Sequence, residues 1–427
     1  MKKRFSNISK IEGELSLPGD KSISHRALIF SALAKGNSTI KNLADSEDVK
    51  RTIECLKTLN IKIEKEDIKY IIHGKGIKGF GKPKSALDCG NSGTTARLLS
   101  GVLAAQEFSS EIIGDESLSK RPMKRIINPL EQMGCTIKSN NGYLPIQFLP
   151  EASINAIKYS LPVASAQVKG ATLLAGLHSD DTTTVVEKST LSRDHTERML
   201  GLPVEIVGKT KTTKASSSYY PTAGEYFVPS DISTAAFFIV LTLLTKNSYL
   251  ILKNVSINET RISFLKILIE MGADIKIESK RESSNEFYGD VIVRSSALKN
   301  VEINPKFIPG IIDEIPILSI AGIFAEGIFS ISGAKELRVK ESDRIKSITT
   351  NLERAGLQIK EFDDGFSVEG KLNNEITKFD SYGDHRIAMA FSVLSCLMKE
   401  GSEVNNFECV NVSNPKFLDQ LEKIKAQ

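Results

Sequence analysis

Cations gather at the start of an apolar segment at residues 17–33, which read LPGDKSISHRALIFSAL. Lys21, His25 and Arg26 lie within six positions, and almost every residue after them is apolar. A helix N-terminus already carries partial positive charge, so cations placed there lower stability unless an anion binds among them. Because backbone amides at such a terminus bind phosphate and carboxylate groups well, the stretch predicts an anion site.

Polar groups of the same kind open several other apolar segments, and arginine and lysine recur among them. Arginine matches phosphate and carboxylate oxygens as a planar fork, and lysine is a compact, mobile charge. If the fold brings these helix starts together, they form a site that attracts anions. The groups are Lys21, Ser22 and Arg26; Asn91, Gly93 and Thr94; Lys120 and Arg121; Ser165 and Gln167; Arg193 and Asp194; Asp313 and Glu314; Lys340, Glu341, Asp343 and Arg344; and Asp384, His385 and Arg386.

Two carboxylates among these groups have the setting that proton transfer requires. Asp313 opens the apolar segment IIDEIPILSIAG, where burial and neighbouring cations compete to set its pKa. Glu341 lies in RVKESDR, between Lys340 and Arg344. A carboxylate held among cations beside an anionic substrate is suited to general acid–base chemistry.

Simpler interpretations exist for most of these residues. Arg26 is also consistent with a surface cation, and residues 91–94 with a turn and helix cap. His195 and His385 fit structural, hydrogen-bonded histidines better than bases, Asp384 fits a helix cap, and Asp194 and Asp343 fit partners of the adjacent arginines. Neither a GxxxxGK[ST] nor a GxGxxG phosphate loop follows an expected strand, and HExxH and related metal motifs are absent.

Composition describes an ordinary globular chain. Its 427 residues predict two or three domains, and a net charge of +4 without a dense basic run does not favour nucleic acid as a partner. The five cysteines have no CxxC spacing and predict reduced thiols of a cytoplasmic protein. The basic start MKKRFSNISKIEG lacks the apolar region of a signal peptide, and no apolar run reaches the length of a membrane span.

The elements that must position these residues form a sixfold repeat. An apolar helix with a small or polar start is followed by a strand, then by an amphipathic helix that ends at Gly or Asn, then by another strand. The last copy, FLDQLEKIKAQ, ends before its strand, and the N-terminal run ISKIEGELSLP is a candidate to supply it. The first helices begin at DKSISHRALIF, GNSGTTARLLS, ASAQVKGATLL, SDISTAAFFIV, DEIPILSIAGI and GDHRIAMAFSV.

Three copies per domain predict one domain at residues 18–228 and a discontinuous second domain at residues 1–17 and 229–427. The chain crosses between them twice, near 17–20 and 228–230, and both crossings contain proline. Two crossings of this kind suit a hinge, and a cleft between domains suits a ligand.

Taken together, the motifs resemble those of the 5-enolpyruvylshikimate-3-phosphate (EPSP) synthase family. They stand in the order of that family from residue 17 to about 415. The resemblance implies a mixed α/β fold of two domains, each built of three βαβαββ units, arranged as an inside-out α/β barrel with the ligand cleft between the domains. The matching segments are LPGDKSISHR, GNSGTTAR, SKRP, ASAQVKGA, SRDHTERML, ELRVKESDR and GDHRIAMA.

The resemblance also implies a reaction and its partners. Members transfer the enolpyruvyl group of phosphoenolpyruvate to the 5-hydroxyl of shikimate 3-phosphate and release phosphate, on the route to chorismate and aromatic amino acids. Neither a metal nor an organic cofactor is implied. Nucleic acid and membrane are not expected partners, and a cytoplasmic monomer is the expected state.

Site residues follow from the same resemblance. Asp313 is expected to take the proton of the 5-hydroxyl, Glu341 to protonate and later deprotonate the donor carbon, and Lys21 to stabilise charge. The phosphoenolpyruvate site would use Lys21, Gly93, Arg121, Gln167, Arg344 and Arg386; the shikimate 3-phosphate site would use Ser22, Arg26, Ser165, Ala166, Gln167, Arg193, Asp313 and Lys340; and Asn91 and Thr94 would shape the loop at 90–94.

Some positions depart from part of the family. Glu336 and Leu337 stand where some members have Asn-Trp, and Val412 stands where some have a lysine that helps bind phosphoenolpyruvate. SAQ replaces SSQ, which points to the second bacterial branch. Family members are glyphosate targets, and Gly93 is retained where tolerant members often have alanine, which leaves inhibitor sensitivity open.

Two rival functions remain to be tested. An enolpyruvyl transferase acting on UDP-N-acetylglucosamine would share fold and donor, but its usual reactive cysteine is missing from GDESLSKRPM. A non-catalytic phospho-anion binder, or a protein that processes RNA ends, would require a basic outer face or a nucleotidyl-accepting histidine, and neither is evident. Replacement of Glu341 separates a binder, which would keep its function, from a synthase, which would lose turnover.

Overall fold

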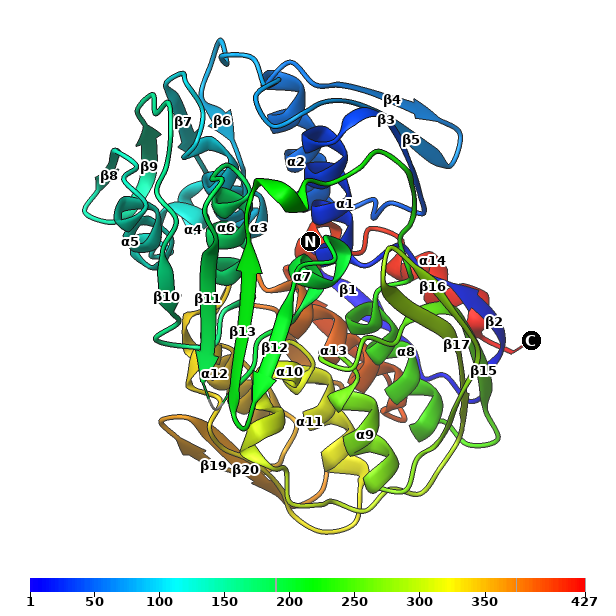
Figure 1. Cartoon of the computed structure of the whole chain (residues 1–427). Coiled ribbons are helices and arrows are strands. Elements are labelled where there is room, and N and C mark those ends of the chain that lie inside the picture. Colours follow the sequence, from blue (N-terminus) through cyan, green and yellow to red (C-terminus); the bar gives the residue numbers. More distant parts are fainter. Residues whose placement is uncertain (189, 374, 427) are drawn as a thin grey trace. The chain divides into compact units, whose positions relative to one another are not determined.

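The computed structural model divides into two compact units (Figure 1). It describes residues 1–188, 190–373 and 375–426. Unit 1 comprises residues 1–18, 230–281 and 287–427, and unit 2 comprises residues 19–229 together with the short segment 282–286. The sequence did not indicate that this short segment groups with unit 2.

Unit 2 contains three four-stranded sheets of one pattern, in which the first pair of strands is parallel and the other two pairs are antiparallel. The first has the order β14 (Glu225–Phe227), β3 (Lys35–Lys41), β5 (Lys69–Lys75), β4 (Lys62–Glu66); the second β6 (Leu87–Asp88), β7 (Ser110–Ile113), β9 (Tyr143–Phe148), β8 (Ile137–Asn140); the third β10 (Lys158–Ser160), β11 (Thr183–Lys188), β13 (Thr210–Ala215), β12 (Val204–Val207).

Unit 1 contains three further sheets. One has four strands in the order β2 (Glu12–Ser16), β15 (Tyr249–Ser256), β17 (Glu286–Arg294), β16 (Asp274–Ser283); the others have three each, β18 (Phe329–Ile331), β20 (Gly365–Glu369), β19 (Gln358–Phe362) and β1 (Lys3–Phe5), β22 (Ser402–Asn405), β21 (Lys378–Asp380).

The six apolar helices and the six second helices all form. The apolar helices are α1 (Lys21–Leu33), α3 (Gly93–Leu103), α6 (Ala166–Gly176), α8 (Ile232–Leu244), α11 (Ile315–Phe324) and α13 (His385–Leu397). The second helices are α2 (Glu47–Thr58), α5 (Lys124–Gln132), α7 (His195–Met199), α9 (Ser263–Glu270), α12 (Arg344–Arg354) and α14 (Phe417–Ile424), and two short helices, α4 (Glu116–Ser119) and α10 (Ile308–Ile311), lie between elements.

Side-chain caps explain where most apolar helices begin. Asp20, Ser92, Ser165, Asp231 and Asp384 each accept a hydrogen bond from a backbone N–H of the following turn. Such caps satisfy donors that a helix cannot satisfy internally. The expected mixed α/β class with three repeats in each unit is confirmed, and none of the sheets described closes into a barrel.

The expectation that the start of the chain completes the last copy is confirmed, but the strand lies outside the predicted run, which meets the end of the last copy at an isolated bridge between Ile11 and Lys425. The strand that pairs with β22 is β1, before that run, whereas β2 within the run pairs in parallel with β15. Alternating apolar residues identify a strand but not its neighbour, because pairing is decided by tertiary arrangement.

Two strands are exchanged between the repeats. β2 directly precedes α1 in the chain but joins the sheet of α8, and β14 directly precedes α8 but joins the sheet of α1. Backbone hydrogen bonds join the two crossing segments. Asp231 N–H donates to Pro18 O at 3.0 Å, and Asp20 N–H donates to Pro229 O at 2.6 Å. The crossings are therefore ordered segments with hydrogen-bonded peptides.

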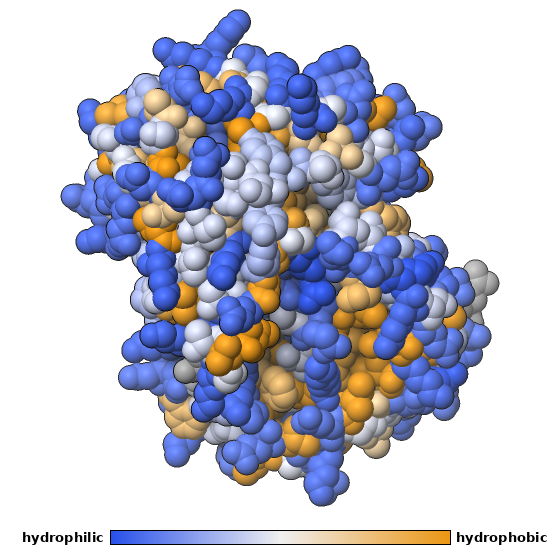
Figure 2. Space-filling view, viewed as in Figure 1, coloured by the Kyte–Doolittle hydropathy of each residue, from blue (hydrophilic) through white to orange (hydrophobic). Residues whose placement is uncertain are grey.

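Each unit has its own apolar core around its three apolar helices. In unit 1, α8, α11 and α13 contact one another, and in unit 2, α3 contacts α1 and α6. Figure 2 shows hydrophilic side chains over much of one face, with apolar groups between them. No single helix in the described ranges is long and apolar enough to span a membrane. One pair of consecutive helices, Pro305–Ile311 and Ile315–Phe324, reaches that length and apolar composition when the two are taken together, but the pair is sharply bent.

A chain of buried hydrogen bonds joins the first three helices of unit 2. The His25 Nδ1 atom lies 2.7 Å from Thr52 Oγ1, Thr52 Oγ1 lies 2.7 Å from Thr95 Oγ1, and Thr95 donates to the capping Ser92 Oγ at 2.7 Å. Burial lowers the pKa of His25 to about 3, against the influence of Asp48. His25 is therefore a neutral structural element of the packed helices.

Close approach of α3 to α6 requires glycine at position 101. A Cβ atom there would lie 2.1 Å from the carbonyl oxygen of Ala171. We expect Gly101→Ala to lower the free energy of unfolding by about 1–3 kcal/mol, the usual range for overpacking. Urea titration measures this, with Gly224→Ala as the control because no atom lies within 4 Å of its Cβ. Equal stability of the two variants would contradict the packing argument.

Neutral His25 predicts a definite pH dependence. With a folded pKa of about 3, below the usual 6.5, the unfolded chain takes up a proton that the folded chain refuses. Stability from His25 is thus complete above pH 6.5 and falls as the pH drops towards 3, by at most about 1.4 kcal/mol per pH unit. NMR titration should show no His25 transition between pH 5 and 8, and a transition near pH 6.5 would refute the assignment.

Candidate functional site

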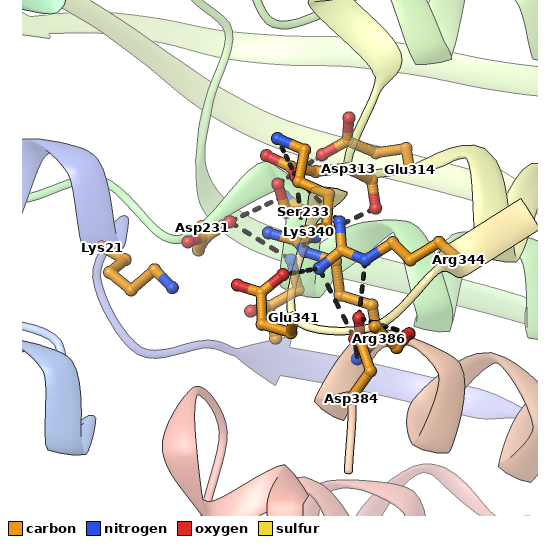
Figure 3. Close-up of polar contacts among 12 residues, drawn as sticks. Lys21, Asp231, Ser233, Asp313, Glu314, Lys340, Glu341, Arg344, Asp384 and Arg386 are labelled. Atoms are coloured by element: carbon orange, nitrogen blue, oxygen red, sulfur yellow. Dashed lines mark hydrogen bonds and ion pairs between the residues drawn. The ribbon is translucent and has the colours of Figure 1, made fainter. Parts of the chain in front are cut away.

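In unit 1, one buried guanidinium holds three carboxylates. Arg344 is 1% exposed, and its Nε donates to Asp384 Oδ2 at 2.7 Å, its Nη1 to Asp313 Oδ1 at 3.1 Å and its Nη2 to Glu341 Oε2 at 2.7 Å (Figure 3). Burial acts to lower the pKa of Arg344, but the three carboxylates outweigh it and raise that pKa above its usual value. Arg344 is therefore always charged and fixed in place.

Two further cations lie near the Asp313 carboxylate, at greater distances than Arg344. Lys340 Nζ lies 3.9 Å and Arg386 Nε 3.8 Å from Asp313 Oδ1, and Arg386 Nη1 also donates to the Asp313 carbonyl oxygen at 3.2 Å. Asp313 is 14% exposed in its side chain and Lys340 29%. Asp313 is thus partly open and faces three cations.

A second buried group lies beside Asp313 in the chain. Glu314 accepts a hydrogen bond from Ser233 at the start of α8, and Arg261 Nη2 lies 3.5 Å from its Oε1. Both Glu314 and Arg261 are almost fully buried. Since Ser233 opens α8 and Glu314 precedes α11, the N-termini of these helices lie together, as predicted within this unit.

Several simpler interpretations are confirmed in both units, although Asp343 and Asp194 pair with Arg338 and Arg198, which are not the adjacent arginines that the sequence suggested. Asp384 caps α13 by accepting from Arg386 N–H, and Asp343 caps α12 by accepting from Lys346 N–H at 3.0 Å and pairs with Arg338. Asp194 pairs with Arg198 at 2.8 Å. Asp384 therefore has two roles, because it caps α13 and also accepts a hydrogen bond from Arg344.

In unit 2, the chain itself supplies anions near the cations of α1. Asp20 caps α1, and Lys21 Nζ lies 2.7 Å from Asp48 Oδ2 in the first turn of α2. The Lys21 side chain remains 23% exposed. The anion expected at this helix start is therefore met in part by Asp48.

The loop before α3 orients an arginine. Asn91 Oδ1 accepts from Arg121 Nη2 at 2.8 Å, while its Nδ2 donates to Asp115 Oδ2 at 2.9 Å. Gly93 begins α3, and a Cβ there would lie 3.4 Å from Arg97 Nη1 and 3.6 Å from Arg121 Nη1. Glycine thus leaves space between two guanidinium groups.

The start of α6 is joined to α3 through an amide. The Nε2 group of Gln167 donates to Thr94 Oγ1 at 3.0 Å, and its Oε1 accepts from Arg97 Nη1. Ser165 caps α6 by accepting from Val168 N–H at 3.3 Å, and Ala166 is the first helical residue. These contacts fix which way the Gln167 amide points.

Arg26 is not a surface cation. It is 3% exposed, and its Nε donates to Thr196 Oγ1 at 2.8 Å while its Nη1 donates to Ser22 O at 2.9 Å. Burial lowers its pKa to about 10, against Glu197, so it stays charged at neutral pH. Arg193 is half-buried and is one of the charges that act on Arg26.

The interpretation of His195 as structural agrees with its contacts. It is 1% exposed and its Nδ1 lies 2.8 Å from Glu286 Oε1, in the short segment that groups with unit 2. No feature of the local sequence marked Glu286 as its partner.

Sequence reasoning missed several charged residues of these clusters. Arg97 lies one turn after Gly93 on α3, which was the available signal. Lys169 was visible as a lysine inside an apolar helix, and Asp48 follows the cap Ser46 of α2. Lys169 and Arg97 lie within the quoted motifs, but neither received a role.

Within each unit the described side chains can bind anions, and those of unit 1 include carboxylates that can also move protons. Unit 1 combines cations with partly exposed carboxylates, and unit 2 combines Lys21, Arg97 and Arg121 with amide and hydroxyl donors at helix starts. Forked and point-charge donors of this kind bind phosphate and carboxylate groups.

Comparisons with known proteins identify the family. The family model described as EPSP synthase (3-phosphoshikimate 1-carboxyvinyltransferase) matches residues 5–421. The 3-phosphoshikimate 1-carboxyvinyltransferase of Petrotoga mobilis is 47% identical over all of both chains, and that of Bacillus subtilis 43% over 98% of this chain and 99% of its own.

Solved structures agree. An EPSP synthase from Acinetobacter baumannii superposes with a TM-score of 0.88 at 38% identity, covering 99% of this chain and 98% of its own. The enolpyruvyl transferase NikO from Streptomyces tendae shares the fold, with a TM-score of 0.77 at 15% identity over 100% of this chain and 97% of its own. The predicted resemblance is confirmed, and the chain belongs to the EPSP synthase family.

Proposed function

We propose that this chain transfers the enolpyruvyl group of phosphoenolpyruvate to the 5-hydroxyl of shikimate 3-phosphate and releases phosphate. Family membership over the whole chain supports the reaction. The observation that carries the mechanism is the pair Asp313 and Glu341, held on neighbouring nitrogens of the buried Arg344.

The two carboxylates are suited to separate proton transfers. Each places one oxygen on Arg344 and remains partly exposed. We assign Asp313 as the base for the 5-hydroxyl, because its carboxylate is partly exposed and Lys340, Arg344 and Arg386 all approach it. We assign Glu341, on the other terminal nitrogen of Arg344, to the donor carbon.

The reaction proceeds by addition and elimination. Glu341 gives a proton to the methylene carbon, and the hydroxyl oxygen, losing its proton to Asp313, bonds to the adjacent carbon. Glu341 then recovers a proton from the new methyl group as the C–O bond to phosphate breaks. Preorganised cations, among them Lys21, stabilise the charge that develops on the leaving phosphate.

The binding residues are proposed as follows. For phosphoenolpyruvate we propose Lys21, Gly93, Arg121, Gln167, Arg344 and Arg386; for shikimate 3-phosphate Ser22, Arg26, Ser165, Ala166, Gln167, Arg193, Asp313 and Lys340; Asn91 and Thr94 orient Arg121 and Gln167. The long contacts of Lys340 and Arg386 with Asp313 support their use by substrate, since weak ion pairs are readily exchanged.

We also propose a cytoplasmic monomer that acts on these small molecules, without nucleic acid or membrane as a partner. All five cysteines are free thiols, as in proteins of reducing compartments. Light scattering of the purified chain measures its mass, for which we expect that of one copy, 46.8 kDa.

Replacement of Glu341 tests the mechanism. Glu341→Gln should lower kcat about 10²–10⁴-fold, the usual contribution of a general acid–base group, with both substrates still bound. Phosphate release with both substrates measures kcat, and calorimetry measures binding. Glu353→Gln on the exposed face of α12 is the matched control and should leave kcat unchanged.

Two results would overturn the proposal. Wild-type protein that binds both compounds but releases no phosphate would be a phospho-anion binder. Phosphate release with UDP-N-acetylglucosamine, and none with shikimate 3-phosphate, would identify the related transferase.

Gly93 tests the assignment of Arg121 to phosphoenolpyruvate. Gly93→Ala places a methyl group at ordinary contact distance from Arg97 and Arg121, so the fold should persist. We expect the KM for phosphoenolpyruvate to rise about 10-fold, because the methyl group occupies space beside the Arg121 guanidinium. Steady-state kinetics measure this, and a larger rise in the KM for shikimate 3-phosphate would contradict the assignment.

A further inference from the structure

A buried ionic network lies in unit 2 among residues that have no assigned role in the reaction. Lys169 Nζ lies 2.7 Å from Glu187 Oε2 and 2.8 Å from Glu197 Oε1, and Lys211 Nζ lies 2.8 Å from the same Glu197 oxygen. All four side chains are at least 94% buried. Burial raises the pKa of Glu197, but the two lysines outweigh it, so the net pKa is lowered and Glu197 is ionised.

Two members of this network hold the peptide groups of Ser192. Glu187 Oε1 accepts from the backbone N–H of Ser192 at 2.8 Å, and Lys169 Nζ contacts the Ser192 carbonyl oxygen at 3.5 Å. The Lys169–Glu187 ion pair therefore holds the backbone of Ser192 through both its N–H and its C=O. The next residue in the chain is Arg193.

Ser192 and Arg193 belong to a segment without regular secondary structure. Residues 190–194 connect β11 to α7, so no helix or sheet ladder fixes the backbone of Arg193. Burying charged groups is costly, and a buried ion pair is often no more stabilising than apolar residues of the same volume. Glu197 is already paired with Lys211, so Lys169 is not required to neutralise it.

We propose that Lys169 and Glu187 are positioning residues for shikimate 3-phosphate binding, acting through the Ser192 backbone on Arg193. The inference rests on the proposed function of Arg193. A guanidinium whose backbone is already fixed loses less conformational freedom when it binds an anion. Loss of the contacts of Lys169 and Glu187 with the Ser192 backbone should therefore weaken binding of shikimate 3-phosphate specifically.

A matched pair of substitutions isolates the hydrogen bond from the charge. Glu187→Gln keeps an oxygen that accepts from Ser192 N–H, whereas Glu187→Leu removes it; both remove the same charge, and Lys169 keeps Glu197 as a partner. We expect Glu187→Leu to raise the KM for shikimate 3-phosphate about 10-fold and Glu187→Gln to raise it less than about 3-fold. The KM for phosphoenolpyruvate should change less than about 3-fold in both.

Lys211→Met controls for disruption of the network as such. Lys211 pairs with Glu197, and no contact of Lys211 with Ser192 is found in the described part of the chain. Its replacement should lower the melting temperature without moving the KM for shikimate 3-phosphate. If Lys211→Met raises that KM as much as Glu187→Leu does, the effect is general loosening and the proposal is wrong.

Arg193→Ala separates the proposed positioning role of Lys169 and Glu187 from the proposed binding role of Arg193, on which it rests. If Arg193→Ala leaves the KM for shikimate 3-phosphate unchanged, the proposed role of Arg193 is wrong. If Arg193→Ala raises it and Glu187→Leu does not, only the positioning role is wrong. In the Arg193→Ala background, Glu187→Leu should add nothing further to the KM, and full additivity of the two effects would also overturn the proposal.

Discussion

Buried charge that must be neutralised within the protein is the constraint on which the site of unit 1 depends. Arg344 is almost inaccessible to water, and removing a guanidinium from water is costly unless partners surround it. Its partners come from three places in the chain: Asp313 before α11, Glu341 before α12 and Asp384 at the cap of α13. These segments must meet for the charge to be compensated, and their meeting also sets the two carboxylates on one planar group.

Unit 2 supplies partners for its cations in several separate groups. Asp48 meets Lys21, Asn91 meets Arg121, and Glu187 and Glu197 meet Lys169. Cations at a helix start would otherwise oppose the helix dipole, and the chain's own acceptors relieve this before any substrate arrives. Such pairs keep the cations in fixed positions, which is the condition for electrostatic preorganisation.

The repeat explains why the same design recurs. Each copy presents the start of an apolar helix, with a capping Asp or Ser in most of them, and three such helices contact each other in unit 1. Polar residues at these starts are therefore brought together by packing of the apolar faces behind them. β2 and β14, which are exchanged between repeats, end directly before the two crossings, so each crossing follows a strand that is paired in a sheet.

The sequence by itself determined the elements and the chemistry. Twelve helices could be predicted from apolar periodicity, caps and glycine stops, because these are local properties. The motifs identified the family and singled out Asp313, Glu341 and Arg344, whose side chains lie in contact. Tertiary structure alone decided the pairings: that β1 rather than β2 completes the last sheet, that Glu286 meets His195, and that Lys169 reaches Ser192. Partners far apart in the chain are chosen by packing geometry and by the need to satisfy buried charge, and neither is written in local spacing.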